Sequence, residues 1–197
     1  MKNLIALLFV VALGTTTYAQ DFEKGGNYIT IGYGVDANGL PGSKVYRKLG
    51  FGPVMLTYER GITDIIGIGR IGIGGGIGFS HYGYNDYNSS FWGGYYYSNE
   101  YLKSVNRLNI FVKAPYHFEF DIDGLDVYAG AGFGVRVDFE KYDDWNGIGY
   151  TEEKRTKVGF DHYIFAGARW YFSETFGVYL EVGDGISNVN AGVVFSL

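Results

Sequence analysis

Apolar and polar residues alternate along most of this chain, most strictly at its end. From Asn188 to Leu197 the odd positions hold Val, Ala, Val, Phe and Leu, whereas the even positions hold Asn, Asn, Gly, Val and Ser. Successive side chains of a strand point to opposite faces, so this segment predicts a strand with one wholly apolar face. A final strand of this kind is typical of an outer-membrane β-barrel, where it lies in the lipid-facing wall.

Seven earlier segments show the same alternation and are separated by turn-like stretches. They predict strands over residues 28–35, 53–59, 65–81, 105–120, 125–140, 158–172 and 176–182, and a slip of parity near Ile68 predicts a bulge. Long and short connections alternate, which predicts external loops at 36–52, 82–103 and 141–157. The pattern predicts an all-β fold, an eight-stranded antiparallel up-and-down transmembrane β-barrel.

Parity alone does not say which face points inward, and a soluble barrel with an apolar interior is the alternative. The face opposite the apolar one is mainly glycine in the third and fifth segments, which would solvate poorly and suits a narrow lumen. We therefore expect the apolar face to contact lipid, with aromatic belts at both interfaces. The expected periplasmic belt is Tyr116, Phe118, Trp170, Phe172, Phe176 and Phe195, and the external belt is Phe79, Phe139 and Phe160.

The N-terminal residues have the three parts of a secretory signal peptide: Lys2, an apolar run over 4–13, and a small-residue site ending at Ala19. We expect 1–19 to be a signal peptide cut after Ala19 and 20–197 to form one barrel domain in the outer membrane of a Gram-negative cell. The rest of the chain has no apolar stretch of about 18 residues, which excludes a transmembrane helix.

Composition narrows the chemistry further. The chain holds 32 glycines and no cysteine, which excludes disulfides and thiolate metal sites. Its net charge of −5 argues against a nucleic-acid partner.

Four motifs make the chain resemble the small outer-membrane β-barrels of the OmpA/OmpX-like type, in the versions common in Bacteroidota. They are Tyr58-Glu59-Arg60-Gly61-Ile62-Thr63-Asp64, Tyr116-His117-Phe118, Gly167-Ala168-Arg169-Trp170-Tyr171-Phe172 and Glu181-Val182-Gly183-Asp184-Gly185. The resemblance covers nearly the whole mature chain and implies a wall-forming protein that is assembled by the barrel assembly machinery. One departure is the last residue, which is usually Phe in that family and is Leu197 here.

Charged residues share the parity of the glycines and are therefore expected to face the lumen. They are Glu59, Arg70, Arg107, Lys113, Glu119, Arg136, Asp138, Asp161, Arg169 and Glu181. Buried charges need partners, so we expect a salt-bridge network that plugs the interior. The alternative is a narrow ion path or a gated pore.

No catalytic, cofactor or metal site is predicted. Barrel lipid A deacylases carry His-x-Ser, whereas His81, His117 and His162 are followed two positions later by Gly83, Glu119 and Ile164. Adjacent Asp161 and His162 would point to opposite faces of a strand, and the three histidines lack metal-ligand spacing.

The segment 82–101 combines aromatic residues with Asn, Ser and Gly, a composition typical of adaptable binding surfaces. The contact residues expected are Tyr84, Tyr87, Phe91, Trp92, Tyr95, Tyr96 and Tyr97. The alternative is that two strands simply extend above the membrane.

The sequence thus predicts a monomeric, non-enzymatic integral outer-membrane barrel, structural or surface-binding. Its expected partners are outer-membrane lipids, the assembly machinery and a surface ligand or host protein. The alternatives are a small passive channel of the porin type and a lipid-modifying enzyme.

Overall fold

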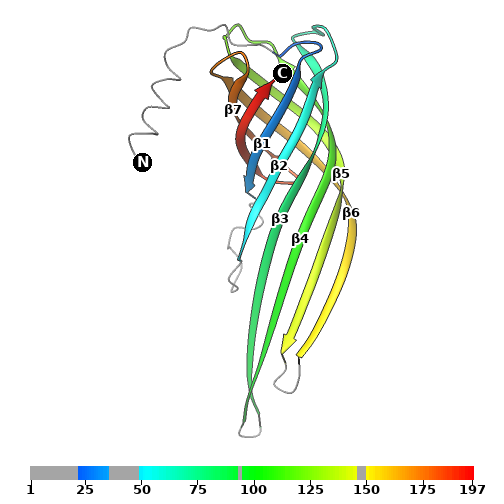
Figure 1. Cartoon of the computed structure of the whole chain (residues 1–197), viewed down its shortest axis with the longest axis vertical. Helices are drawn as coiled ribbons and strands as arrows, with labels where there is room; N and C mark the ends of the chain where they lie inside the picture. The colour runs from blue at the N-terminus through cyan, green and yellow to red at the C-terminus, as the bar shows by residue number, and fades with distance from the viewer. Residues whose placement is uncertain (1–21, 36–48, 93–94, 146–149) are drawn as a thin grey trace, which may run out of the picture.

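The computed structural model describes residues 22–35, 49–92, 95–145 and 150–197, and these residues form one closed barrel (Figure 1). Its strands are β1 (Asn27–Val35), β2 (Leu49–Gly61), β3 (Gly69–Trp92), β4 (Tyr95–Phe118), β5 (Leu125–Trp145), β6 (Tyr150–Tyr171), β7 (Phe176–Asp184) and β8 (Val189–Ser196). Each strand pairs antiparallel with the next, and β1 closes the ring against β8. This confirms the predicted all-β, eight-stranded, up-and-down architecture. Among the described residues, no helix is long and apolar enough to cross a membrane.

The two faces of the wall are arranged as the alternation predicts. In β1, Ile31, Tyr33 and Val35 are exposed, whereas Tyr28 and Thr30 are buried. The same holds in β7, where Val178, Leu180 and Val182 are exposed and Tyr179 and Glu181 are buried. The apolar side chains therefore cover the outside of the barrel, and the smaller and polar ones fill it.

Glycines of the inner face make room for large aromatic rings. A Cβ at Gly32 would lie 1.9 Å from the hydroxyl of Tyr179, and one at Gly167 would lie 2.7 Å from that of Tyr128. Tyr128 and Tyr163 pack with Phe111, Phe165, Met55 and Ile186 as an apolar layer across the lumen. The sequence analysis predicted that glycines and charged residues line the lumen, and it did not predict these aromatic rings.

The predicted periplasmic aromatic residues lie at the expected ends of the strands, whereas Phe79, Phe139 and Phe160 lie inside β3, β5 and β6, because those strands continue past the predicted ends. Trp170 pairs with Leu125 and Phe118 with Val127, so Trp170 and Phe118 share the rim that carries the short turns. At that rim the rings of Phe176 and Phe195 are 5.4 Å apart. Phe160, toward the other end, is 86% exposed.

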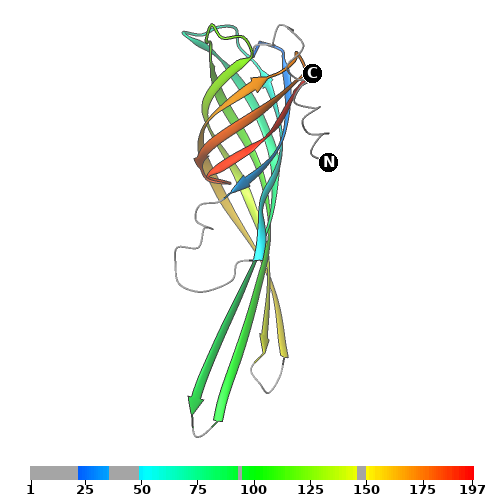
Figure 2. The same cartoon turned by 90° about the vertical axis from the view of Figure 1, so that its left-hand side faces the viewer.

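Strands β3–β6 run well past the other four at the end opposite the C-terminus (Figures 1 and 2). The predicted loops at 82–103 and 141–157 are therefore wrong, because β3 pairs with β4 as far as Trp92↔Tyr95 and β5 with β6 as far as Trp145↔Tyr150. Tyr, Trp and Thr favour extended backbone, and a strand that continues past the closed barrel need not show apolar alternation. The strands therefore extend as the alternative stated, and whether their aromatic residues bind a partner stays a prediction.

Some local predictions also change. The parity slip near Ile68 is a turn with Gly67 at φ 69° and not a bulge, and β3 begins at Gly69. The register shift in this part of the sheet lies instead in β2, between Phe51 and Val54. Residues 49–52 of the predicted loop 36–52 belong to β2. The remainder of that loop and the signal peptide 1–19 fall outside the described residues.

Candidate functional site

The centre of the buried charge network is His117, on β4. Its Nδ1 lies 2.6 Å from Oδ1 of Asp126 on β5, and its Nε2 lies 2.6 Å from Oε1 of Glu59 on β2. The other oxygens of both carboxylates accept from Arg169 on β6, at 2.8 Å for Glu59 and 3.3 Å for Asp126. The Arg169 side chain is completely buried. Four strands are thereby joined through one pair of carboxylates.

Three further residues, Lys113, Glu181 and Tyr128, extend this network toward the projecting sheet. Lys113 Nζ lies 3.4 Å from Glu59 and 3.9 Å from Glu181, and the hydroxyl of Tyr128 donates to Glu181 over 3.2 Å. The guanidinium of Arg169 lies over the Tyr128 ring at 4.8 Å. Every charged member of this network therefore has a partner, as buried charges require.

The buried network contains equal numbers of acidic and basic residues. It holds three carboxylates (Glu59, Asp126, Glu181) and three basic side chains (Lys113, His117, Arg169). Each acidic side chain lies against at least one basic side chain, which fits a stabilising plug.

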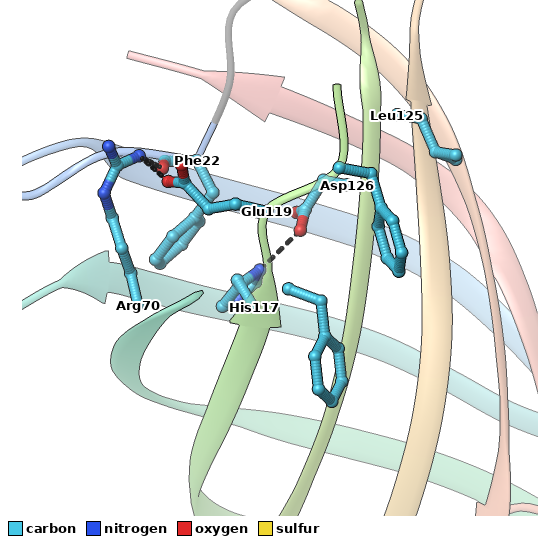
Figure 3. Close-up of a pocket in the computed structure, with 8 residues that line it drawn as sticks. Phe22, Arg70, His117, Glu119, Leu125 and Asp126 are labelled. Carbon is cyan, nitrogen blue, oxygen red and sulfur yellow. Dashed lines mark hydrogen bonds and ion pairs between the residues drawn. The ribbon is translucent and has the colours of Figure 1, made fainter. Parts of the chain in front are cut away.

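At the rim that carries the short turns, the side chain of Phe22 lies over this network beside His117 and Asp126 (Figure 3). The ring of Phe22 stacks on His117 and on Tyr28, and the Phe22 carbonyl accepts a hydrogen bond from Arg70. Arg70 also pairs with Glu119 at 2.7 Å. A pocket of only about 30 Å³ remains between Phe22, His117 and Asp126.

A second group of charges lies on the other side of the apolar layer, where the sheet of β3–β6 leaves the barrel. Arg107 binds Asp138 in a bidentate manner at 2.8 and 3.2 Å, and Arg136 Nη1 lies 2.9 Å from Asp161. Glu140 pairs with Lys157 at 2.8 Å and Lys103 at 3.0 Å. The hydrogen bond from Lys157, followed by that from Tyr142, lowers the pKa of Glu140 to about 2.

The second group surrounds an open cavity of about 280 Å³. Its lining residues are Tyr82, Lys103, Val105, Arg107, Asp138 and Glu140. The apolar layer around Phe111, Tyr163 and Phe165 separates this cavity from the buried network around His117. The interior is thus divided into two charged compartments.

The structure distributes the predicted lumen charges over three places. Glu59, Lys113, Arg169 and Glu181 meet in the buried network; Arg107, Arg136, Asp138 and Asp161 form the upper group; Arg70 and Glu119 lie at the mouth. The prediction omitted His117 and Asp126, although His117 shares the parity of Lys113 and Asp126 that of Asp138. Both residues lie inside predicted strands, over 105–120 and 125–140, so the parity that could have found them was present in the sequence.

The aromatic contact residues predicted between Tyr84 and Tyr97 lie on the projecting parts of β3 and β4. Tyr84 pairs with Lys103, Tyr87 with Glu100, Phe91 with Tyr96 and Trp92 with Tyr95. The register places these residues on the projecting sheet, beyond the closed barrel. Their side chains fall outside the described part of the structure.

Catalytic groups are not assembled around the histidines. His81 Nδ1 lies 2.8 Å from Asn106 on the exposed outer face, His162 is exposed, and His117 is held in the buried network. Within residues 22–35, 49–92, 95–145 and 150–197, no group of three or more His, Cys, Asp or Glu side chains could hold a metal ion.

No known family model matches the chain. No curated protein matches it in sequence either.

Solved structures that resemble the chain include the N-terminal β-barrel domain of Pseudomonas aeruginosa OprF, with 14% identity, coverage of 88% of this chain and 98% of that one, and a TM-score of 0.40. Another is Ail, the attachment invasion locus protein of Yersinia pestis. In complex with the heparin analogue sucrose octasulfate it gives 11% identity, coverage of 88% and 96%, and a TM-score of 0.44. Ail without that ligand gives 13% identity, coverage of 88% of this chain and 96% of that one, and a TM-score of 0.41. At such identities and scores, function has to be inferred from the chain's own residues.

Proposed function

We propose that this protein is a non-enzymatic integral outer-membrane β-barrel that displays its projecting β3–β6 sheet for binding outside the cell. The membrane placement is supported by the outer face of the wall, where Phe133, Val158 and Ile164 are each more than 60% exposed. In water, an apolar belt of this extent would be an aggregation liability. In lipid, a closed barrel satisfies every ladder hydrogen bond and leaves no open edge.

The plugged interior argues against the passive channel. Phe22, the buried network and the apolar layer succeed one another along the lumen from the rim that carries the short turns. A barrel of eight strands has room for little more than its own side chains. The alternative of a lipid-modifying enzyme has no support from the histidines.

The observation that carries the binding proposal is an unequal pair of sheet edges. Pairing of β2 with β3 ends at Leu49↔Gly83, and pairing of β6 with β7 begins at Ile164↔Asp184. Beyond those points β3 and β6 each have one side unpaired with any described strand. Such an edge can accept an extended segment of another protein as an added strand.

The two edges differ in how they are protected. Residues 152–157 of β6 read Glu-Glu-Lys-Arg-Thr-Lys, and charges of this density discourage added strands. Residues 84–92 of β3 contain one charge, Asp86, and no proline. We therefore assign binding to the β3 edge, with an extended segment of a surface or host protein as the partner.

The test compares two hairpin deletions of matched design. Removing 86–101 shortens β3 and β4 at paired positions, and removing 143–152 shortens β5 and β6 in the same way. Cells displaying each variant are assayed on a panel of immobilised extracellular proteins and glycans, after heat-modifiable gel migration has shown that the barrel is folded. Binding should be lost with the first deletion and kept with the second, and binding unchanged by the first deletion would refute the proposal.

A further inference from the structure

The outer wall of the barrel has an apolar notch over β1–β3. Ile29, Tyr58, Gly75 and Val112 form one row across β1–β4. Tyr58 and Val112 are exposed, so this row faces outward. Gly75 contributes no side chain to it, which leaves a groove of about 270 Å³ between Ile29, Leu56, Tyr58 and Ile77.

The notch is built into the backbone. A Cβ at Gly75 would lie 2.6 Å from the carbonyl oxygen of Phe111, so the position does not accept a side chain. Tyr58 is held as a side wall, because its hydroxyl donates to Oδ1 of Asn27 over 2.7 Å, toward the barrel rim. The groove therefore stays open by construction.

A cation stands at the rim end of the same groove. Arg60 lies one row from Tyr58, paired with Asn27 and Ile73, and its Nη1 donates to the same Asn27 oxygen over 3.1 Å. Arg60 is exposed, and it forms no ion pair with any described carboxylate. Its guanidinium is thus positioned beside the groove with donors left for a ligand.

We propose that the groove and Arg60 bind one phospholipid of the periplasmic leaflet. The acyl chain lies in the notch over Gly75, and the phosphate accepts hydrogen bonds from Arg60. This proposal rests on the membrane placement above, which puts the short-turn rim, and with it Arg60, at the periplasmic side. Guanidinium groups suit phosphate oxygens, and an acyl chain lying in the notch gains van der Waals contacts with its walls.

The experiment titrates phosphatidylglycerol into the delipidated, folded full-length mature protein in a non-ionic detergent and counts bound lipid by native mass spectrometry. Two variants attack the site: Arg60→Gln removes the cation, and Leu56→Trp fills the groove. Two controls match them: Lys24→Gln changes another rim cation, which pairs with Asp64, and Leu180→Trp enlarges an outward leucine on β7. Leu56 and Leu180 are similarly exposed, at 45% and 53%.

We expect one tightly retained lipid, binding about tenfold weaker in each site variant and unchanged binding in both controls, since a factor of ten corresponds to about 1.4 kcal/mol. Retention unaffected by both site variants would overturn the site. Equal retention of a diacylglycerol would overturn the role of Arg60. A dimer abolished by Leu56→Trp would show that the groove is occupied by a second copy.

Heat-modifiable migration, measured first for every variant, separates the two proposals. A folded, membrane-inserting barrel that retains no lipid refutes the lipid site alone. A chain that needs neither detergent nor bilayer to fold refutes the membrane placement itself.

Discussion

The ring of Phe22 lies flat on the imidazole of His117, with centroids 3.5 Å apart and planes only 2° from parallel. Phe22 precedes the first strand, and His117 is the residue that joins the two carboxylates of the buried network. Phe22, which lies before β1, therefore covers the buried network around His117 and keeps water from it.

Replacing Phe22 by alanine removes this cover and a buried ring. We expect the free energy of unfolding to fall by about 3 kcal/mol, as for a large core residue cut to alanine. Reversible urea unfolding in lipid vesicles measures it. Phe160→Ala is the control, because Phe160 is 86% exposed and contacts lipid instead. Equal losses in both variants would show that Phe22 does not seal the mouth.

The two arginines Arg169 and Arg136 should differ strongly in their contribution to stability. Arg169 is completely buried, and Arg169→Gln leaves Glu59 and Asp126 with uncompensated charge, at a cost of about 3–5 kcal/mol. Arg136 is 35% exposed beside Asp161, so Arg136→Gln should cost about 1 kcal/mol or less. Sequence parity alone treats the two arginines as equivalent. Similar unfolding midpoints for the two variants would contradict the exclusion of water from the buried network around Arg169.

The divided lumen predicts that the protein does not conduct. Planar bilayers should show no stable single-channel current for the wild type or for Phe22→Ala, because the layer of Phe111, Tyr163 and Phe165 still blocks the path. A steady current that changes size with Arg136→Gln would favour the porin reading.

Glu140 predicts a pH dependence of the projecting sheet. Hydrogen bonds from Lys157 and Tyr142 lower its pKa from 4.5 to about 2 in the folded state. The stabilisation is therefore complete above the unfolded value and is lost as pH falls from about 4.5 to 2. A carboxyl NMR titration should show Lys157→Met raising the pKa of Glu140. An unchanged value would contradict the pairing.

Much of the wall could be predicted from sequence, because period-two alternation reports directly on a two-faced strand. The projecting half of β3–β6 could not, because these parts of the strands do not belong to the closed wall, and their sequences lack the alternation and resemble loops. The buried network was predicted only in part. Parity shows that Glu59 and Arg169 face inward, but only the closed register brings residues 110 positions apart to 2.8 Å. Parity also places Gly75 on the outward face with Ile73 and Ile77, but the groove beside it appears only when β2 and β3 are brought together.

The placement of the apolar face in lipid is tested most directly at two neighbouring residues of β4. Ile110 is exposed on the outer face, and Asn109 is buried in the lumen. Because the chain has no cysteine, a single spin label can be attached at each position after substitution by cysteine. In lipid vesicles, a label at Ile110 should relax strongly with oxygen, which partitions into the bilayer, and a label at Asn109 should not. Equal oxygen accessibility at the two positions, or preferential contact of the Ile110 label with a water-soluble relaxation agent, would contradict a lipid-facing wall.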